Sequence, residues 1–173
     1  MTATLAFDVY GTLIDTHGVV EALRAHIGDR APAFSQRWRE KQLEYSFRRG
    51  LMQHYAPFSV CVAESLDFCC AEFGLALDEA GRAALLGGFA RLPAFDDAAP
   101  GLAAAAAAGL RLFAFSNGSA DAVEGLLEGA GLRAWFTEVV SCDEVKSFKP
   151  NPGVYAHFLR RAGVAGGEAW LVS

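Results

Sequence analysis

The sequence has few of the features that mark membrane, secreted or nucleic-acid-binding proteins. It lacks an apolar run of the roughly 18 residues that a membrane-spanning helix needs, and its N-terminus lacks a basic region followed by an apolar core. Its net charge of −5 provides no excess of positive charge to attract nucleic acid or an anionic membrane. We therefore predict a soluble, cytoplasmic protein that binds neither nucleic acid nor membranes.

Cysteine is scarce, and the four cysteines form no C-x-x-C pair. Cys61, Cys69, Cys70 and Cys142 stand among apolar or mixed neighbours, where a reduced thiol packs as a small hydrophobic side chain. This spacing gives little support to a zinc site or a disulfide framework, although it leaves both open. Buried thiols of a reducing compartment are the favoured interpretation.

Four short apolar runs predict β-strands, at residues 4–7, 111–116, 137–141 and 169–173. A helical stretch precedes each of the three later runs, at residues 101–108, 119–130 and 152–162. This alternation is typical of βαβ units, whose strands form a parallel sheet. With 53% hydrophobic residues among 173, the chain can bury one compact core. We predict an α/β protein with a doubly wound parallel sheet (a Rossmann-like core).

The stretch between the first and second predicted strands is far too long for one crossover helix. Apolar residues recur in it at spacings of three and four, which predicts helices at residues 19–27, 33–55, 59–73 and 78–91. We therefore expect residues 15–94 to form a helical cap subdomain, and residues 1–14 and 95–173 to form a discontinuous core domain. A cap over the end of the sheet can exclude water from the chemistry below it.

A carboxylate, Asp8, follows the first predicted strand directly, and Gly11 comes three residues later. The carboxyl ends of parallel strands face the crevice in which open α/β sheets bind ligands. Gly11 suits a tight turn there because glycine adopts positive φ without steric cost. Ser116 ends the second predicted strand, and Lys149 stands just before the start of a helix. Each has a simpler explanation on its own: a turn-capping aspartate, a strand-end hydroxyl that satisfies local backbone, and a solvated lysine.

Together, Asp8, Ser116 and Lys149 resemble three motifs of the haloacid dehalogenase (HAD) superfamily. The resemblance implies a HAD-like doubly wound parallel sheet with an inserted helical cap, and it makes Asp8 the nucleophile. It makes Lys149 the cation that keeps Asp8 ionised, and Thr12 and Ser116 the hydroxyls that orient the carboxylates. Tyr155, in the first turn of its helix, is expected either to return to the crevice or to pack as a core aromatic.

Position 10 separates two activities within this superfamily. Superfamily phosphatases carry a second aspartate two residues after the nucleophile, which protonates the leaving alkoxide and later activates water. This sequence has Tyr10 at that position. A halide leaves without a proton, so loss of that acid harms dehalogenation far less than phosphoryl transfer. Tyr10 therefore favours a dehalogenase, and a Mg²⁺-dependent phosphatase stays the alternative enzyme.

Arg39 leads an apolar stripe on a predicted helix, with Leu43, Phe47 and Leu51 following at intervals of four. A solvated arginine is the simpler explanation. The segment nevertheless resembles the one in L-2-haloacid dehalogenases (haloacid dehalogenase type II) whose arginine binds the substrate carboxylate and the departing halide. A planar fork of donors suits a carboxylate. The residues assigned to substrate binding are Val9, Tyr10, Arg39, Leu43, Phe58, Ser116 and Asn117.

The family's fourth motif begins at a serine after the fourth strand, which corresponds to Ser173, and continues with an asparagine and an acidic residue. We expect the C-terminal part of a longer protein to be missing. The resemblance implies hydrolysis of short (S)-2-haloalkanoates to (R)-2-hydroxyalkanoates and halide through an aspartyl ester, without a metal or organic cofactor. A truncated, inactive fragment that binds small carboxylates is the non-enzymatic alternative. The oligomeric state, including a homodimer, stays open.

Overall fold

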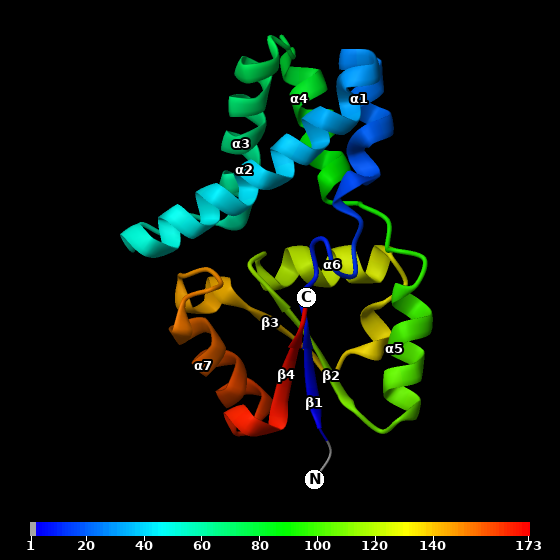
Figure 1. Cartoon of the computed structure of the whole chain (residues 1–173), viewed down its shortest axis with the longest axis vertical. Helices are drawn as coiled ribbons and strands as arrows, with labels where there is room; N and C mark the ends of the chain where they lie inside the picture. The colour runs from blue at the N-terminus through cyan, green and yellow to red at the C-terminus, as the bar shows by residue number, and fades with distance from the viewer. Residues whose placement is uncertain (1–2) are drawn as a thin grey trace.

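The computed structural model describes residues 3–173, and a four-stranded parallel sheet organises its lower part (Figure 1). The strand order is β3-β2-β1-β4, and all neighbouring strands are parallel. The strands are β1 (Thr4–Phe7), β2 (Arg111–Ser116), β3 (Glu138–Ser141) and β4 (Ala169–Val172). All four predicted strands are present; the third begins one residue later than predicted and the fourth ends one residue earlier.

Helices cover both faces of this sheet, so the predicted doubly wound α/β fold is confirmed (Figure 1). The covering helices are α5 (Ala98–Ala107) and α6 (Ala120–Gly129) on one face and α7 (Pro152–Ala162) on the other. Successive residues of a strand point to opposite faces, and the side chains of β2 divide accordingly. Leu112 and Ala114 join the larger core, which includes α5 and α6, whereas Phe113 and Phe115 pack with α7.

Between β1 and α5, four α-helices form a helical lobe beyond the carboxyl ends of the strands (Figure 1). They are α1 (Val20–Ile27), α2 (Ala31–Met52), α3 (Phe58–Phe73) and α4 (Glu79–Phe89). All four predicted helices are present, but α2 begins two residues earlier and ends three residues earlier than predicted. It ends at Met52 because Gln53 adopts a left-handed conformation, with φ of 55°.

The helical lobe has buried aromatic residues of its own. Phe34 and Trp38 of α2 are almost completely buried, at 0% and 1% exposure. The Phe34 ring packs edge to face with Phe73 of α3 at 5.1 Å, and Trp38 Nε1 donates a hydrogen bond to the carbonyl of Val62 at 2.9 Å. Burial of one phenylalanine side chain contributes roughly 1.5–3 kcal/mol. These contacts hold α2 against α3 and fix the helix that carries Arg39.

Two backbone segments join the lobe to the sheet and run beside each other. The Asp15 N–H donates to the carbonyl of Pro93 at 2.8 Å, and the Phe95 N–H donates to the carbonyl of Leu13 at 3.0 Å. The chain thus enters and leaves the lobe through two adjacent, hydrogen-bonded segments, close to the turn that follows Asp8.

Short 3₁₀ helices complete the regular elements of the described chain. They are η1 (Thr16–Val19), η2 (Gly28–Arg30), η3 (Arg133–Trp135), η4 (Cys142–Val145) and η5 (Gly166–Glu168). The segment after η4 leads to Lys149. None of the helices within residues 3–173 is long and apolar enough to cross a membrane.

Candidate active site

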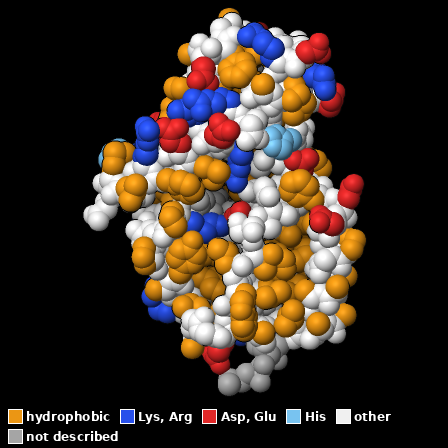
Figure 2. Space-filling view, viewed as in Figure 1, with side chains coloured by type: hydrophobic (Ala, Val, Ile, Leu, Met, Phe, Trp, Pro, Cys, Tyr) orange, Lys and Arg blue, Asp and Glu red, His pale blue; other side chains and the backbone are white. Residues whose placement is uncertain are grey.

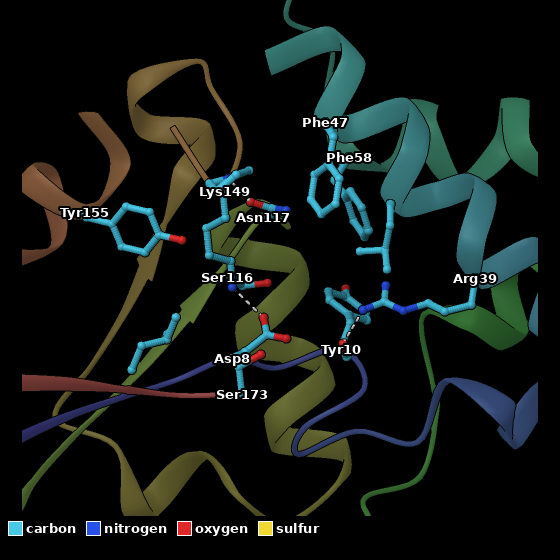
Figure 3. A pocket seen from close by; sticks show the side chains of 13 residues that line it. Asp8, Tyr10, Arg39, Phe47, Phe58, Ser116, Asn117, Lys149, Tyr155 and Ser173 are labelled. Atoms are coloured by element: carbon cyan, nitrogen blue, oxygen red, sulfur yellow. Dashed lines mark hydrogen bonds and ion pairs between the residues drawn. The ribbon is translucent and has the colours of Figure 1, made fainter. Parts of the chain in front are cut away.

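A cavity of about 290 Å³ lies where the carboxyl ends of the strands face the helical lobe (Figure 3). The space-filling view shows a hollow between the lobe and the sheet, with basic and acidic side chains in it (Figure 2). Segments far apart in the sequence meet here because parallel strands end at the same edge of the sheet. The lining residues are Asp8, Tyr10, Arg39, Leu43, Phe47, Phe58, Ser116, Asn117, Lys149, Pro150, Tyr155, Leu171 and Ser173.

Asp8 and Lys149 form an ion pair in this cavity. Asp8 continues the line of β1, since its backbone N–H donates to the carbonyl of Val172 at 2.9 Å. Lys149 Nζ lies 2.5 Å from Asp8 Oδ1 and donates to the carbonyl of Phe115 at 2.9 Å. The two side chains are only 12% (Lys149) and 18% (Asp8) exposed, so salt screens the pair little. The pair therefore fixes the direction in which the Asp8 carboxylate faces the cavity.

The turn after β2 holds the backbone of Lys149 in place. Asn117 Oδ1 accepts a hydrogen bond from the Lys149 N–H at 2.9 Å. Ser116 is completely buried, and its Oγ accepts from the Gly118 N–H at 3.1 Å. Ser141, at the end of β3, donates to the carbonyl of Gly118 at 2.6 Å. These bonds make a rigid turn that presents Ser116 and Asn117 to the cavity.

The turn after β1 places Asp8, Thr12 and Arg39 close together. Gly11 takes φ of +91°, a conformation that glycine adopts without strain. A Cβ atom at Gly11 would lie 3.4 Å from Arg39 Nη2, so the glycine also leaves room for the guanidinium. Thr12 Oγ1 lies 3.4 Å from Asp8 Oδ2, which makes a long hydrogen bond, and Thr12 lies outside the cavity lining. Thr12 thus contacts the Asp8 carboxylate without itself lining the cavity.

Arg39 reaches from α2 into the cavity (Figure 3). Its Nη2 donates to the backbone carbonyl of Tyr10 at 2.5 Å, while its buried Nη1 has no hydrogen-bond partner among the described residues. Burial lowers the pKa of Arg39, and the nearby Asp8 opposes that shift. A buried donor without a partner costs about 1–3 kcal/mol, so Nη1 is available to an anion that enters the cavity.

Two tyrosines contribute neutral phenol groups to the lining. Burial raises the pKa of Tyr10 to about 12, with Arg39 acting in the opposite direction. The Tyr155 hydroxyl points into the cavity (Figure 3), and burial raises its pKa as well. Its ring packs edge to face with Phe115 at 5.8 Å. Tyr155 therefore both reaches the crevice and packs as a core aromatic, two placements that the sequence presents as alternatives.

One residue that the sequence assigns to substrate binding lies outside the lining. The Val9 side chain is completely buried, at 0% exposure, in the larger core of the protein. Its carbonyl accepts the backbone N–H groups of Leu13 and Ile14, both at 3.0 Å. Val9 thus shapes the turn that carries Asp8, and its side chain does not face the cavity.

Three lining residues are missing from the set that the sequence predicts. They are Phe47, Pro150 and Leu171. The helical spacing from Arg39 and Leu43 could have identified Phe47, and Pro150 directly follows Lys149. Nothing in the sequence pattern points to Leu171, because its place depends on the pairing of β4 with β1.

The chemistry of the cavity depends on one carboxylate and two cations. Asp8 is the one acidic side chain among the described lining residues. Within residues 3–173, His, Cys, Asp and Glu side chains form no group of three or more suited to hold a metal ion. A carboxylate fixed by an ammonium, facing a guanidinium with a free donor, suits nucleophilic attack on a small acid with an anionic leaving group. The fold and the site together define an α/β protein whose cavity, at the carboxyl ends of the parallel strands, has a single carboxylate side chain among its described lining residues.

Comparison with known proteins narrows this class. The family model of the haloacid dehalogenase-like hydrolases matches residues 2–173. The (S)-2-haloacid dehalogenase of Pseudomonas sp. (strain YL) is 38% identical over 151 residues, which cover 87% of this chain and 65% of that relative. The (S)-2-haloacid dehalogenase of Xanthobacter autotrophicus is 38% identical over 173 residues, which cover 100% of this chain and 68% of that relative.

A solved structure gives the same result. The L-2-haloacid dehalogenase from Xanthobacter autotrophicus with chloropropionic acid covalently bound matches with a TM-score of 0.90 and 36% identity, over 99% of this chain and 69% of that chain. The chain belongs to the haloacid dehalogenase-like hydrolases and, within them, to the (S)-2-haloacid dehalogenases, which are hydrolases acting on carbon–halide bonds. It spans 65% of the length of the Pseudomonas relative.

Proposed function

We propose that this protein hydrolyses short (S)-2-haloalkanoates to (R)-2-hydroxyalkanoates and halide through an ester on Asp8, without a metal or organic cofactor. The observation that carries the proposal is the Asp8–Lys149 ion pair in one cavity with the partnerless Nη1 of Arg39. The names of the Pseudomonas and Xanthobacter relatives support this substrate class. Chloride release from 2-chloropropionate in the presence of EDTA tests it. Release that EDTA abolishes would favour a metal-dependent enzyme instead.

The proposed reaction has two steps. In the first, an Asp8 oxygen forms a bond to C2 while the carbon–halogen bond breaks, and the halogen leaves as an anion with the bonding electrons. The free Arg39 donor is available to the substrate carboxylate or to this anion. In the second step, water adds to the aspartyl carbonyl and the bond from that carbon to the substrate oxygen breaks. One water proton passes to the departing oxygen, which becomes the hydroxyl group, and the other goes to solvent as Asp8 returns to the carboxylate. Because displacement inverts C2 and hydrolysis keeps the C2–O bond, an S substrate gives an R product.

A Mg²⁺-dependent phosphatase is the alternative enzyme and has less support. Such an enzyme needs a group that protonates a leaving alkoxide, and Tyr10 stands where superfamily phosphatases carry an aspartate. Since burial raises the pKa of Tyr10 to about 12, its hydroxyl is a poor acid at neutral pH. Departure of a halide makes no such demand.

Arg39→Lys is expected to lower the second-order rate constant for halide release at least about tenfold, equivalent to roughly 1.4 kcal/mol of transition-state stabilisation. Lysine keeps the positive charge but loses the two-nitrogen guanidinium group. In that group Nη2 binds the Tyr10 carbonyl while Nη1 stays free. Arg37→Lys is the matched control, because Arg37 lies on the same helix but binds Glu72 outside the cavity. Equal losses in the two variants would assign Arg39 to the lobe structure and not to the substrate.

The second step can be tested separately from the first, because hydrolysis of the ester needs a base that activates water. The described lining residues include no histidine and no acidic side chain other than Asp8. The 173-residue chain is therefore expected to release about one halide per molecule in a burst and then stop, as an enzyme does when a covalent intermediate accumulates. Halide counted per chain with substrate in excess is the measurement. Sustained release over many turnovers would show that other groups activate the water.

The proposal also covers the domain division of the protein, its location in the cell, its partners and its oligomeric state. Residues 15–94 act as the cap and residues 1–14 and 95–173 as the core domain, a division supported by aromatic pairs within the lobe, Phe34 with Phe73 and Trp38 with Phe89. A cytoplasmic location is supported by four free cysteines, three of them buried. The net charge of −5 supports a small-molecule partner and disfavours nucleic acid and membranes. A homodimer is supported by Leu51 and Met52, which are 84% and 64% exposed at the end of α2.

A further inference from the structure

A second cavity, of about 240 Å³, lies between α3 and α4 of the lobe and the start of α6, and we call it the side chamber. Its buried walls are the rings of Tyr10, Phe58 and Phe89 and the side chain of Val62. Its mouth reaches the surface at Ala122, which is exposed. None of its described lining residues carries a charge, so the side chamber suits an aliphatic group better than an ion.

Tyr10 and Phe58 line both the side chamber and the catalytic cavity, so their rings form the wall between the two. The two rings pack with centroids 5.5 Å apart. Tyr10 also stacks on Phe89 at 5.6 Å, and a Cβ atom at Gly118 would lie 3.2 Å from Tyr10 Cε2. Tyr10 is thus held by neighbours on several sides. Phe58, the first residue of α3, is the part of the wall that a substitution can remove without altering the turn after Asp8.

We propose that Phe58 limits the length of the alkyl chain that the active site accepts, by closing the side chamber against the tail of the substrate. This inference rests on the proposed dehalogenase function, in which the charged end of the substrate stays near Arg39. The side chamber is nearly as large as the catalytic cavity, so it has room for an alkyl tail once the Phe58 ring is absent. Each methylene group that leaves water for these apolar walls favours binding.

The test compares 2-bromopropionate with 2-bromooctanoate as alkylating substrates, with ester formation on the protein followed by intact mass. The unaltered protein is expected to react with the short acid at least about tenfold faster, and Phe58→Ala is expected to bring the two rates to within about threefold. This convergence of the two rates must come from a faster reaction with 2-bromooctanoate, not from a slower reaction with 2-bromopropionate. Phe58→Leu, a smaller change, is expected to give an intermediate preference, so the test does not depend on the folding of the alanine variant.

Ala122→Phe provides the matched control, because Ala122 lines the side chamber and not the catalytic cavity. Alone, it is expected to leave the reaction with 2-bromopropionate unchanged. Combined with Phe58→Ala, it is expected to restore the preference for the short acid by filling the side chamber. An unchanged preference in both Phe58 variants, with normal reaction of the short acid, overturns the inference while the proposed function stands. If neither acid reacts with the unaltered protein, the proposed function fails and the inference fails with it.

Discussion

Replacement of Asp8 by asparagine is expected to reduce halide release from 2-chloropropionate at least about a thousandfold. The amide has nearly the size of the carboxylate but is not a nucleophile of comparable strength. No other acidic side chain among the described residues lines the cavity, so the protein has no substitute in place. Lys149 keeps its hydrogen bond to the Phe115 carbonyl, which preserves part of the local structure in the variant.

The measurement is halide release in single turnover, with thermal unfolding as the check on folding. Asp67→Asn is the matched control, because Asp67 binds Arg82 at the surface of the lobe, away from the cavity. We expect it to keep full activity. Halide release by Asp8→Asn at a rate close to that of Asp67→Asn would remove Asp8 from the chemistry and leave direct attack by water as the explanation.

Lys149→Met is expected to lower the rate of ester formation at least about a hundredfold, which corresponds to roughly 2.7 kcal/mol. Methionine keeps much of the length of the side chain but loses the ammonium that lies 2.5 Å from Asp8 Oδ1. It also leaves the Asp8 carboxylate, only 18% exposed, without the cation that offsets its desolvation. The carboxylate then lacks both its orientation and its counter-charge.

Lys146→Met is the matched control for this variant. Lys146 precedes Lys149 by three residues in the same segment, but its ammonium binds Asp143 and its side chain is 65% exposed. The control is expected to change the rate of ester formation little. Comparable losses in the two variants would mean that positive charge in this segment, and not the ion pair with Asp8, explains the effect.

The polar residues at the strand ends are predictable from the sequence for a physical reason. Asp8 directly follows an apolar strand, and Ser116 ends another. A parallel sheet brings such ends to one edge, so their meeting in one cavity follows from the strand assignment alone. Asn151 similarly marks the start of α7, because its side chain accepts the Gly153 N–H at 2.8 Å, and this start fixes the place of Lys149 nearby.

Other parts of the site depend on tertiary packing that a sequence pattern does not carry. The direction of the Val9 side chain is set by a tight turn, which sends it into the core and away from the cavity. Leu171 reaches the cavity only because β4 pairs with β1, in a register that sets Leu171 beside Ala6. The wall formed by Tyr10 and Phe58 joins a turn of the sheet domain to a helix of the lobe, and no local pattern relates the two.

Mass spectrometry of the peptide that contains Asp8, after a single turnover of 2-chloropropionate in H₂¹⁸O, tests the central claim most directly. The claim is that the Asp8 carboxylate itself attacks C2. We expect an acid-quenched sample to carry the substrate as an ester on Asp8, and alkaline hydrolysis of that ester in H₂¹⁸O after the quench to leave ¹⁸O in the Asp8 carboxyl group. An unmodified Asp8 without label, together with ¹⁸O in the hydroxyl group of the product, would contradict the claim, because water would then have attacked the substrate directly.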